Sequence, residues 1–448
     1  MTGQRAILAF FVVITLLPLL ARADVKNKRT YISIFAKKIL KTPIAIANFV
    51  QEGEKETALA FTLRSIVRQD LDFTNYFTFV PPESFLEDPN KQEKIDFTKW
   101  RSLKVRFLIL GNFTKKEDNL IVTLKMFDTQ EEKIIFKKTL EAHEIKQRHL
   151  MHLFSNNLVE ILTGEKGIFL TKIAFTSDKT GHKELYVMDY DGKNITQLTK
   201  RKNYVLLPSW SPDGKKLLFS SYTEHKKNVK NLDLFIFSLE TKKTEILSQK
   251  TGLNMGGVFT PDGKYVALTL SVRDGYPNIY LHDLEKKEAQ IIAQSSESDF
   301  SPAFSPDGKK LLFVSTRKGN PHLFIRDLRG PATEAKRLTF AGKYNAKPDW
   351  SPAGDKIVFA GQLEGHFDLF SIDAKGYTIE RLTKIISEGD NEHPSWSPNG
   401  QHLAFYSTRQ KKSDIYIITA DGSLEKKLTS DFGNCTTPAW SPVNFENF

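Results

Sequence analysis

The hydrophobic positions beyond residue 168 form short, strand-length runs that follow one recurring order. A run ending in an aromatic residue comes first, as at Leu217-Leu218-Phe219, and a second run then alternates around an aromatic, as at Leu234-Phe235-Ile236. A short third run such as Leu198-Thr199 closes the unit. Asp-Gly pairs, for example Asp421-Gly422, separate the runs, and this dipeptide favours tight hairpins because both residues tolerate positive φ. The pattern predicts short antiparallel strands joined by tight turns.

Six copies of an anchor, an aromatic residue followed by Ser or Thr and then Pro, open successive units. The hydroxyl residues lie 44 to 49 positions apart, and a period of this length indicates a repeat architecture. Counting the run that ends in the anchor, each period holds four short strands, which is the content of one propeller blade. The anchors are Trp210-Ser211-Pro212, Phe259-Thr260-Pro261, Phe304-Ser305-Pro306, Trp350-Ser351-Pro352, Trp396-Ser397-Pro398 and Trp440-Ser441-Pro442.

The two ends of the repeat region complement each other. The first unit, near Ile173-Ala174-Phe175, has three strands but no anchor strand before it, whereas the last anchor, Pro438 to Ser441, has no strands after it. Joining the two fragments completes one blade and leaves no open edge, which a solenoid would not require. We therefore predict a six-bladed β-propeller over residues 168–448 that is closed by the C-terminal strand.

Residues 24–165 have a different pattern, which predicts a small α/β domain with a short linker at 164–167 before the propeller. Between Glu54 and Asp70, apolar residues recur at helical spacing. Gly164 suits the position after the last helix because it accepts a left-handed conformation. The other predicted elements are strands at 31–35, 44–50, 77–80 and 105–110, a hairpin at 120–127 and 134–140, and helices at 97–103 and 144–162.

The first 23 residues predict an export signal. Arg5 precedes an apolar run from Ala6 to Leu20, and Ala21-Arg22-Ala23 is a small-x-small cleavage site before Asp24. The run is shorter than the roughly 20 residues that a membrane span needs. We therefore expect cleavage between Ala23 and Asp24 and a mature protein exported to the periplasm, without a membrane anchor of its own.

Charge and cysteine content exclude some classes of function. The formal net charge is +11, and removal of Arg5 and Arg22 with the signal leaves +9. The positive residues occur mostly as scattered Lys-Lys pairs such as Lys242-Lys243, which favour solvated strand edges and turns over a nucleic-acid surface. Because Cys435 is the single cysteine, no internal disulfide is possible and stability must come from packing and ring closure.

No residue pattern indicates catalysis. The chain has no Gly-x-Ser-x-Gly, and no segment follows the last blade to hold a hydrolase domain. His149 and His152, with His143 nearby, are interpreted as a polar helix face without an acidic partner, and His366 and His393 as loop residues. Asp213, Asp262 and Asp307 each stand beside Gly in a hairpin turn, which explains them without calcium. We predict a protein that is not an enzyme and has no metal or cofactor.

The propeller predicts a binding platform, because loops gather around the central channel on two faces. The residues just before each anchor run rim one mouth, and several are apolar or aromatic where a solvated loop requires neither. Phe300 and Tyr344 have an equally good explanation as caps on blade packing. The candidate partner-binding residues at the mouth are Leu207, Leu253, Asn254, Met255, Phe300, Tyr344, Asn345, Glu392, His393 and Thr437.

The export signal, the α/β region, the junction Leu162-Thr163-Gly164-Glu165-Lys166-Gly167 and the six anchors together resemble the TolB family, over essentially the whole chain. This family is the periplasmic component of the Tol-Pal envelope system of Gram-negative bacteria. The resemblance implies a monomeric, non-enzymatic adaptor that supports outer-membrane integrity and envelope constriction during cell division. It also implies binding of the outer-membrane lipoprotein Pal at the propeller mouth, and peripheral association with membranes through partners.

The resemblance further implies that the N-terminal segment engages the C-terminal domain of TolA, an inner-membrane partner. Alternation at Tyr31 to Phe35 suits strand addition to a partner's sheet. Lys26, Lys28 and Arg29 make the segment basic where the family is acidic to neutral, and Leu253 stands where a Pal-facing His is expected. Two alternatives stay open: a secreted hydrolase or lyase using a channel-facing His, and a peptidoglycan or carbohydrate sensor. The TolA-binding candidates are Asp24, Val25, Lys26, Tyr31, Ile32, Ile34 and Phe35.

Overall fold

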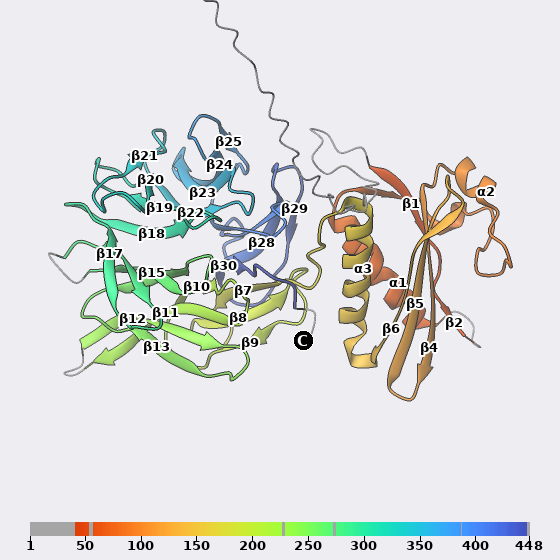
Figure 1. Ribbon diagram of the computed structural model, residues 1–448. Coiled ribbons are helices and arrows are strands. Elements are labelled where there is room, and N and C mark those ends of the chain that lie inside the picture. The colour runs from red at the N-terminus through yellow and green to blue at the C-terminus, as the bar shows by residue number, and fades with distance from the viewer. Residues whose placement is uncertain (1–40, 53–56, 226–228, 272–274, 387, 446–448) are drawn as a thin grey trace, which may run out of the picture.

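The computed structural model describes residues 41–52, 57–225, 229–271, 275–386 and 388–445. The predicted signal peptide and the predicted strand at 31–35 lie outside these described residues. An N-terminal α/β region and a six-bladed propeller lie side by side (Figure 1). Within the described residues, no helix is both long and apolar enough to cross a membrane.

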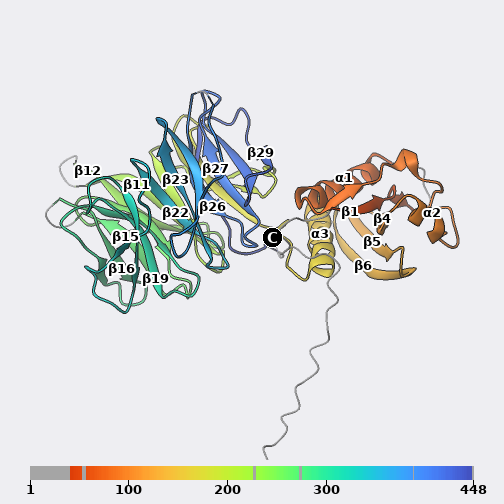
Figure 2. The same cartoon turned by 90° about the horizontal axis from the view of Figure 1, so that it is seen from above.

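The N-terminal region is a mixed sheet with two main helices on one face. The strand order is β3-β1-β4-β5-β6, with β1 parallel to β3 and β4, and with β4, β5 and β6 antiparallel. In both views α1 and α3 lie on the propeller side of this sheet (Figures 1 and 2). The elements are β1 (Thr42–Ile46), β2 (Val50–Gln51), α1 (Ala58–Phe73), β3 (Phe77–Phe79), η1 (Pro82–Ser84), α2 (Phe97–Ser102), β4 (Phe107–Lys116), β5 (Asn119–Asp128), β6 (Lys133–His143), η2 (Glu144–Lys146) and α3 (Gln147–Thr163).

Local chemistry sets the ends of the helices. The side chain of Thr57 accepts a hydrogen bond from the backbone N–H of Ala60, so α1 begins at Ala58 rather than in the predicted first turn at Glu54. At the other end of the region, Gly164 has φ 81° and ends α3 as predicted, because glycine adopts this left-handed conformation without a Cβ clash. The single strand predicted at 44–50 is wrong, because the structure has two short strands there, β1 and β2, and the helix predicted from 144 begins as the 3-10 turn η2 before α3. The other predicted elements within the described residues are confirmed with shifted bounds, the largest shift being in β4, which continues to Lys116 through its pairing with β5.

The propeller consists of six four-stranded antiparallel sheets, which confirms the predicted fold. The first strand of each sheet is innermost, and neighbouring inner strands pack against one another around the ring. In ring order the sheets are β30 (Cys435–Trp440), β7 (Lys172–Ser177), β8 (Glu184–Asp189), β9 (Thr196–Gln197); β10 (Val205–Trp210), β11 (Lys216–His225), β12 (Val229–Ser238), β13 (Thr244–Ser248); β14 (Asn254–Phe259), β15 (Tyr265–Leu270), β16 (Asn278–Asp283), β17 (Ala289–Ala293); β18 (Asp299–Phe304), β19 (Lys310–Ser315), β20 (His322–Asp327), β21 (Lys336–Arg337); β22 (Asn345–Trp350), β23 (Lys356–Leu363), β24 (His366–Asp373), β25 (Ile379–Arg381); and β26 (Asn391–Trp396), β27 (His402–Ser407), β28 (Asp414–Thr419), β29 (Glu425–Lys427).

The anchor hydroxyls hold the first turn of every blade. Ser211 Oγ accepts a hydrogen bond from the backbone N–H of Lys216 at 2.9 Å and donates one to Asp213 at 2.6 Å. The Thr260 hydroxyl likewise donates to Asp262, and this bond holds the pKa of that carboxyl below its usual value. The turn aspartates therefore serve the hairpins, in agreement with the sequence interpretation.

The last anchor makes the same contact across the two ends of the propeller. Ser441 Oγ accepts from the backbone N–H of Lys172 at 2.9 Å, and the Ser441 N–H donates to the Lys172 carbonyl at 2.8 Å. Strand β30 pairs with β7 from Cys435↔Ser177 to Trp440↔Ile173. The C-terminal strand thus closes the ring, as its orphan anchor predicted.

A buried polar cluster joins the N-terminal region to the propeller. Asp70 on α1 and His152 on α3 are 1% and 3% exposed, and a carboxylate oxygen of Asp70 lies 2.9 Å from His152 Nδ1. The hydroxyl of Tyr190, in the β8–β9 turn, donates to Asp70 at 2.5 Å, and Arg148 forms an ion pair with Asp191 at 2.5 Å. The spacing of His149 and His152 suggested a polar helix face. This interpretation is wrong for His152, because its side chain is buried and its acidic partner, Asp70, comes from a different helix.

We predict that Tyr190→Phe destabilises the protein by about 1–3 kcal/mol, because a buried carboxylate loses a hydrogen bond. Urea unfolding followed by circular dichroism measures the change. As a control, Tyr204→Phe alters a side chain that is 61% exposed and should change the free energy of unfolding by less than about 0.5 kcal/mol. Equal stabilities for Tyr190→Phe and the unaltered protein would contradict the role assigned to this cluster.

Candidate functional site

The six inner strands surround a central channel with a cavity of about 460 Å³. Each inner strand begins at one face of the propeller and ends at the other with its anchor aromatic. The anchor turns face the N-terminal region: Phe73 at the end of α1 stacks on His402 at 4.2 Å, beside the turns at Pro352 and Pro398. The starts of the inner strands therefore open on the opposite face, away from that region.

Every inner strand carries a bulge at the same position. The pairing register with the second strand shifts at residues 207–208, 256–257, 301–302, 347–348, 393–394 and 437–438. The first residue of each bulge has a positive φ between 51° and 63°, although only one of the six is glycine. Such a conformation costs non-glycine residues about 1–3 kcal/mol each and is kept where the surrounding fold enforces it. The six residues are Leu207, Gly256, Ser301, Lys347, His393 and Thr437, and all of them line the channel.

The channel is electrostatically uneven. Burial lowers the pKa of Lys347 to about 8, and nearby Glu392 partly opposes this shift. Burial also lowers the pKa of His393 well below its ordinary value, and the positive charge of Lys347 adds to the effect. At pH 7 Lys347 therefore presents an ammonium group to the channel, and His393 presents a neutral imidazole.

Two carboxyl groups of the inner strands also have raised pKa values. Burial raises the pKa of Asp349 to about 6, although its oxygens accept hydrogen bonds from the backbone N–H groups of Trp350 and Trp396. Burial also raises the pKa of Glu392, which accepts a hydrogen bond from the Tyr406 hydroxyl at 2.5 Å. Among the described residues, no group of three or more His, Cys, Asp or Glu side chains is arranged to hold a metal ion.

The structure divides the predicted mouth residues into three groups. Leu207, His393 and Thr437 line the channel. Leu253, Met255, Phe300, Tyr344 and Glu392 are partly exposed at the starts of the inner strands and form the rim. Asn254 and Asn345 are 0% and 3% exposed.

The two asparagines support the rim from inside. Asn254 Oδ1 accepts from the Ser248 hydroxyl at 2.7 Å and from the backbone N–H of Lys250 at 2.8 Å. The side-chain amide of Asn345 lies 2.9 Å from His322 Nδ1 and donates to the Ala341 carbonyl at 2.9 Å. Both side chains thus hold the loops that carry the rim.

The sequence left open whether Phe300 and Tyr344 cap the packing of the blades or are exposed for contact with a partner, and both residues combine packing with exposure. Each packs against the hydrophobic core between the β18–β21 and β22–β25 blades, and the ring of Tyr344 meets Phe367 edge-on at 5.6 Å. Each also keeps part of its surface exposed at the rim. Their exposed edges are therefore fixed in position before any partner arrives.

Sequence reasoning missed several residues of this face. Ser301 and Lys347 line the channel, and their signal was the proline that follows the bulge residue in five of the six inner strands. Tyr204 and Tyr276, which are 61% and 47% exposed, extend the apolar rim outward, and Tyr222 meets Tyr204 edge-on at 6.5 Å.

Comparison with known proteins identifies relatives of both parts of the chain. A family model described as the TolB amino-terminal domain matches residues 30–135, and one described as the TolB beta propeller domain matches residues 159–444. The chain is 35% identical to the Tol-Pal system protein TolB of Desulfosudis oleivorans over 56% of this chain and 57% of that protein. It is 32% identical to a TolB homolog of Chlorobium luteolum over 66% of this chain and 67% of that protein.

A solved structure matches over a longer span. The crystal structure of TolB from Acinetobacter baumannii superposes with a TM-score of 0.78 at 27% sequence identity, covering 90% of this chain and 97% of that chain. The similarity therefore includes the N-terminal region as well as the propeller.

We predict that Lys347→Met stabilises the protein at pH 7 by up to about 3 kcal/mol, because it removes a charge whose burial is unfavourable. In the unaltered protein this penalty is full below pH 8 and is relieved as pH rises, since folded Lys347 loses its proton near pH 8 and the unfolded chain near its ordinary value of 10.5. The advantage of the variant should thus shrink between pH 8 and 9.5 in urea unfolding. An exposed control, Lys343→Met, should show no such trend. A pH-independent difference would contradict the prediction.

Proposed function

The chain belongs to the TolB family, and we propose that it is a non-enzymatic, periplasmic adaptor of the Tol-Pal envelope system. In this proposal the propeller mouth binds the outer-membrane lipoprotein Pal, and residues 24–35 bind the C-terminal domain of TolA. The relatives are named as Tol-Pal system proteins, and that name describes membership of an envelope assembly rather than a reaction. The adaptor would couple the two membranes during envelope constriction and so maintain outer-membrane integrity.

The observation that carries the Pal proposal is the rim of the channel on the face turned away from the N-terminal region. Leu253 and Tyr204 expose 36% and 61% of their surface there, and the partly exposed rings of Phe300 and Tyr344 lie on the same face in the two following blades. Apolar and aromatic side chains that are held rigidly around a depression are the usual energetic centres of protein interfaces. Asn254 and Asn345 enter the proposal as supports of this rim rather than as contact residues.

The polar part of the channel adds specificity to this apolar rim. Lys347, His393 and Thr437 stand at the third position of their inner strands and line the channel, further inside the ring than the rim residues, where an ionic interaction is stronger than at the surface. A partner loop that covers the rim therefore has a charged group and hydroxyl groups to meet below it. This arrangement favours recognition of one partner over adhesion to any apolar surface.

The TolA proposal rests on sequence. Ile32 and Ile34 alternate with polar or aromatic neighbours, a pattern that suits a strand added to the edge of another sheet. The export signal at 1–23, with cleavage between Ala23 and Asp24, would deliver the mature chain to the periplasm with this segment at its N-terminus. We keep the division into an α/β domain at 24–165 and a propeller at 168–448, and we expect the protein to act as a monomer.

We predict that Phe300→Ala together with Tyr344→Ala weakens binding of the periplasmic domain of the Pal-type lipoprotein by about 2 kcal/mol, roughly thirtyfold. Isothermal titration calorimetry with residues 24–448 measures the affinity. Because both rings also pack against the blade core, Leu253→Glu serves as a second variant that introduces a charge at an exposed position.

Leu424→Glu is the matched control, since Leu424 is 52% exposed in the β28–β29 turn on the opposite face. Pal binding should be unchanged in this variant. Unchanged affinity in both mouth variants would remove the mouth as the Pal site. Binding of muropeptides without any binding of Pal would favour the sensor alternative.

We predict that deletion of residues 24–37 abolishes binding of the TolA C-terminal domain and leaves Pal affinity within twofold. The reason is that the segment supplies the added strand, whereas the mouth lies in the propeller. A double substitution, Ile32→Asp with Ile34→Asp, tests the same strand without shortening the chain. Surface plasmon resonance with both partners measures the outcome, and loss of Pal binding with retained TolA binding would reverse the assignment.

A further inference from the structure

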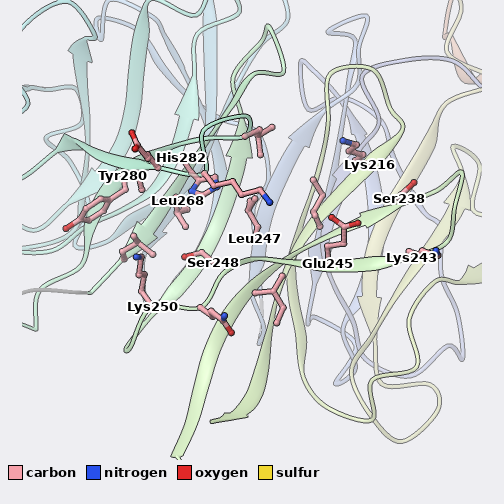
Figure 3. Close-up of a pocket in the computed structure, with 18 of the residues that line it drawn as sticks. Lys216, Ser238, Lys243, Glu245, Leu247, Ser248, Lys250, Leu268, Tyr280 and His282 are labelled. Carbon is pink, nitrogen blue, oxygen red and sulfur yellow. The ribbon is translucent and has the colours of Figure 1, made fainter. Parts of the chain in front are cut away.

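A long groove separates two neighbouring blades on the flank of the propeller (Figure 3). It lies between the β10–β13 blade and the β14–β17 blade and has a volume of about 1260 Å³. We call it the interblade groove. It is lined chiefly by Leu247, Leu268, Tyr280 and Leu284 and by two lysines, Lys243 and Lys287. The groove shares no lining residue with the channel, although Ser248 and Lys250 at its end also hold Asn254 beneath the mouth rim.

The groove extends along β13, the outermost strand of the β10–β13 blade. Four consecutive residues, Glu245 to Ser248, line it. The pairing of β13 with β12 shifts register between Ile246 and Ser248, and this bulge interrupts the alternation of side chains so that consecutive residues reach the groove. By contrast, β15 contributes the alternate residues Leu268 and Leu270, so the neighbouring blade presents one face as the floor. Strand β13 is the last in its sheet, and no other strand of the described residues pairs with its outer row of backbone N–H and C=O groups.

The outer strands here differ from those of the other blades. Both β13 and β17 have five residues, whereas β9 and β21 have two and β25 and β29 have three. Short outer strands are a common protection against pairing with other chains. The two blades beside the groove have longer outer strands, each with one register irregularity in its pairing, and β13 offers an edge of roughly 17 Å for pairing.

The charges at the groove favour an acidic occupant. Four lysines and two glutamates line it, and none of the four lysines has a salt bridge within the described parts of the chain. Burial lowers the pKa of His282 at the groove, so its ring adds no charge at pH 7. The chain's own basic segment, with Lys26, Lys28 and Arg29, carries the same sign of charge as these lysines and is disfavoured as an occupant. The lysines are Lys216, Lys243, Lys250 and Lys287, and the glutamates are Glu245 and Glu288.

We propose that the interblade groove binds an extended acidic segment of a partner protein, which adds as a strand to the free edge of β13. The backbone of this segment would pair with the Thr244–Ser248 strand. Its alternate apolar side chains would cover Leu247, Leu268 and Tyr280, and its carboxylates would pair with the lysines of the groove. An anionic polysaccharide would satisfy the lysines but not the unpaired backbone groups. The proposal is therefore for a polypeptide and does not depend on the function assigned to the mouth.

The test uses two fluorescein-labelled ten-residue peptides, one alternating glutamate with valine and one alternating lysine with valine, and residues 24–448 of the protein. Fluorescence anisotropy at low and physiological salt should show that the acidic peptide binds at least tenfold more tightly than the basic one. Lys243→Glu with Lys287→Glu should weaken binding of the acidic peptide at least tenfold. The matched control, Lys336→Glu with Lys426→Glu, reverses the charge of two exposed lysines on the outer strands β21 and β29. It should leave the affinity for the acidic peptide unchanged.

Hydrogen exchange by mass spectrometry distinguishes strand addition from charge attraction alone. The acidic peptide should slow exchange of the amides in residues 244–248 at least fivefold, whereas alginate, an anionic polysaccharide, should leave them unchanged. Equal affinities in the groove and control variants, or peptide binding without protection of β13, would overturn the proposal. Tighter binding of alginate than of the acidic peptide would likewise overturn it, in favour of an anionic polymer site.

Discussion

The pairing of β30 with β7 is the contact on which the rest of the propeller depends. It joins segments from opposite ends of the repeat region through four paired positions and through the reciprocal hydrogen bonds of Ser441 and Lys172. Without it, one blade would lack its inner strand and the ring would have two open edges. Closure also links the C-terminal end to the linker and to the N-terminal region, because Asn444, just after β30, donates to the Gly167 carbonyl and accepts from the side-chain amide of Asn156 on α3 at 3.4 Å. One strand therefore fixes the ring and its junction together.

The closed ring explains why strain can persist around the channel. Five non-glycine residues have left-handed backbone conformations at equivalent bulges, among them the β-branched Thr437 at φ 51°. Each bulge is held between the pairing of its own blade and the packing of adjacent inner strands, so relaxation of one would require the ring to open. The consequence is a channel whose lining side chains have fixed positions. A surface organised in advance loses less conformational entropy on binding than flexible loops would.

The fold could be predicted from the sequence because its information is local and repeated. Each anchor carries its own hydrogen-bonding residues, such as Ser211 and Asp213, and the orphan anchor at Ser441 predicts the closure.

The functional surfaces depend on contacts between residues that are distant in the sequence, and prediction was weaker there. The partner of His152 is Asp70, 82 positions away, so spacing on one helix could not reveal it. Asn254 lies beside exposed rim residues in sequence, yet its side chain turns inward to hold the preceding loop. Lys347 is followed by a proline, as are the equivalent residues of most other blades. Only the bulge at this position in the structure shows that the residue before the proline lines the channel.

The junction determines how the surfaces of the molecule relate to each other. Tyr190, His152 and Asp70 form directional hydrogen bonds in a buried site, and Arg148 pairs with Asp191 beside them. Separation of the two parts would remove the Tyr190 hydroxyl from Asp70 and break the Arg148–Asp191 ion pair, and the loss of a hydrogen bond to a buried carboxylate alone costs about 1–3 kcal/mol. Because the cluster uses the β8–β9 turn, the N-terminal region is held on the turn face of the propeller. The mouth therefore remains open on the opposite face, and the flank between β13 and β17 remains accessible from the side. A molecule bound at the mouth would therefore not need to displace the N-terminal region.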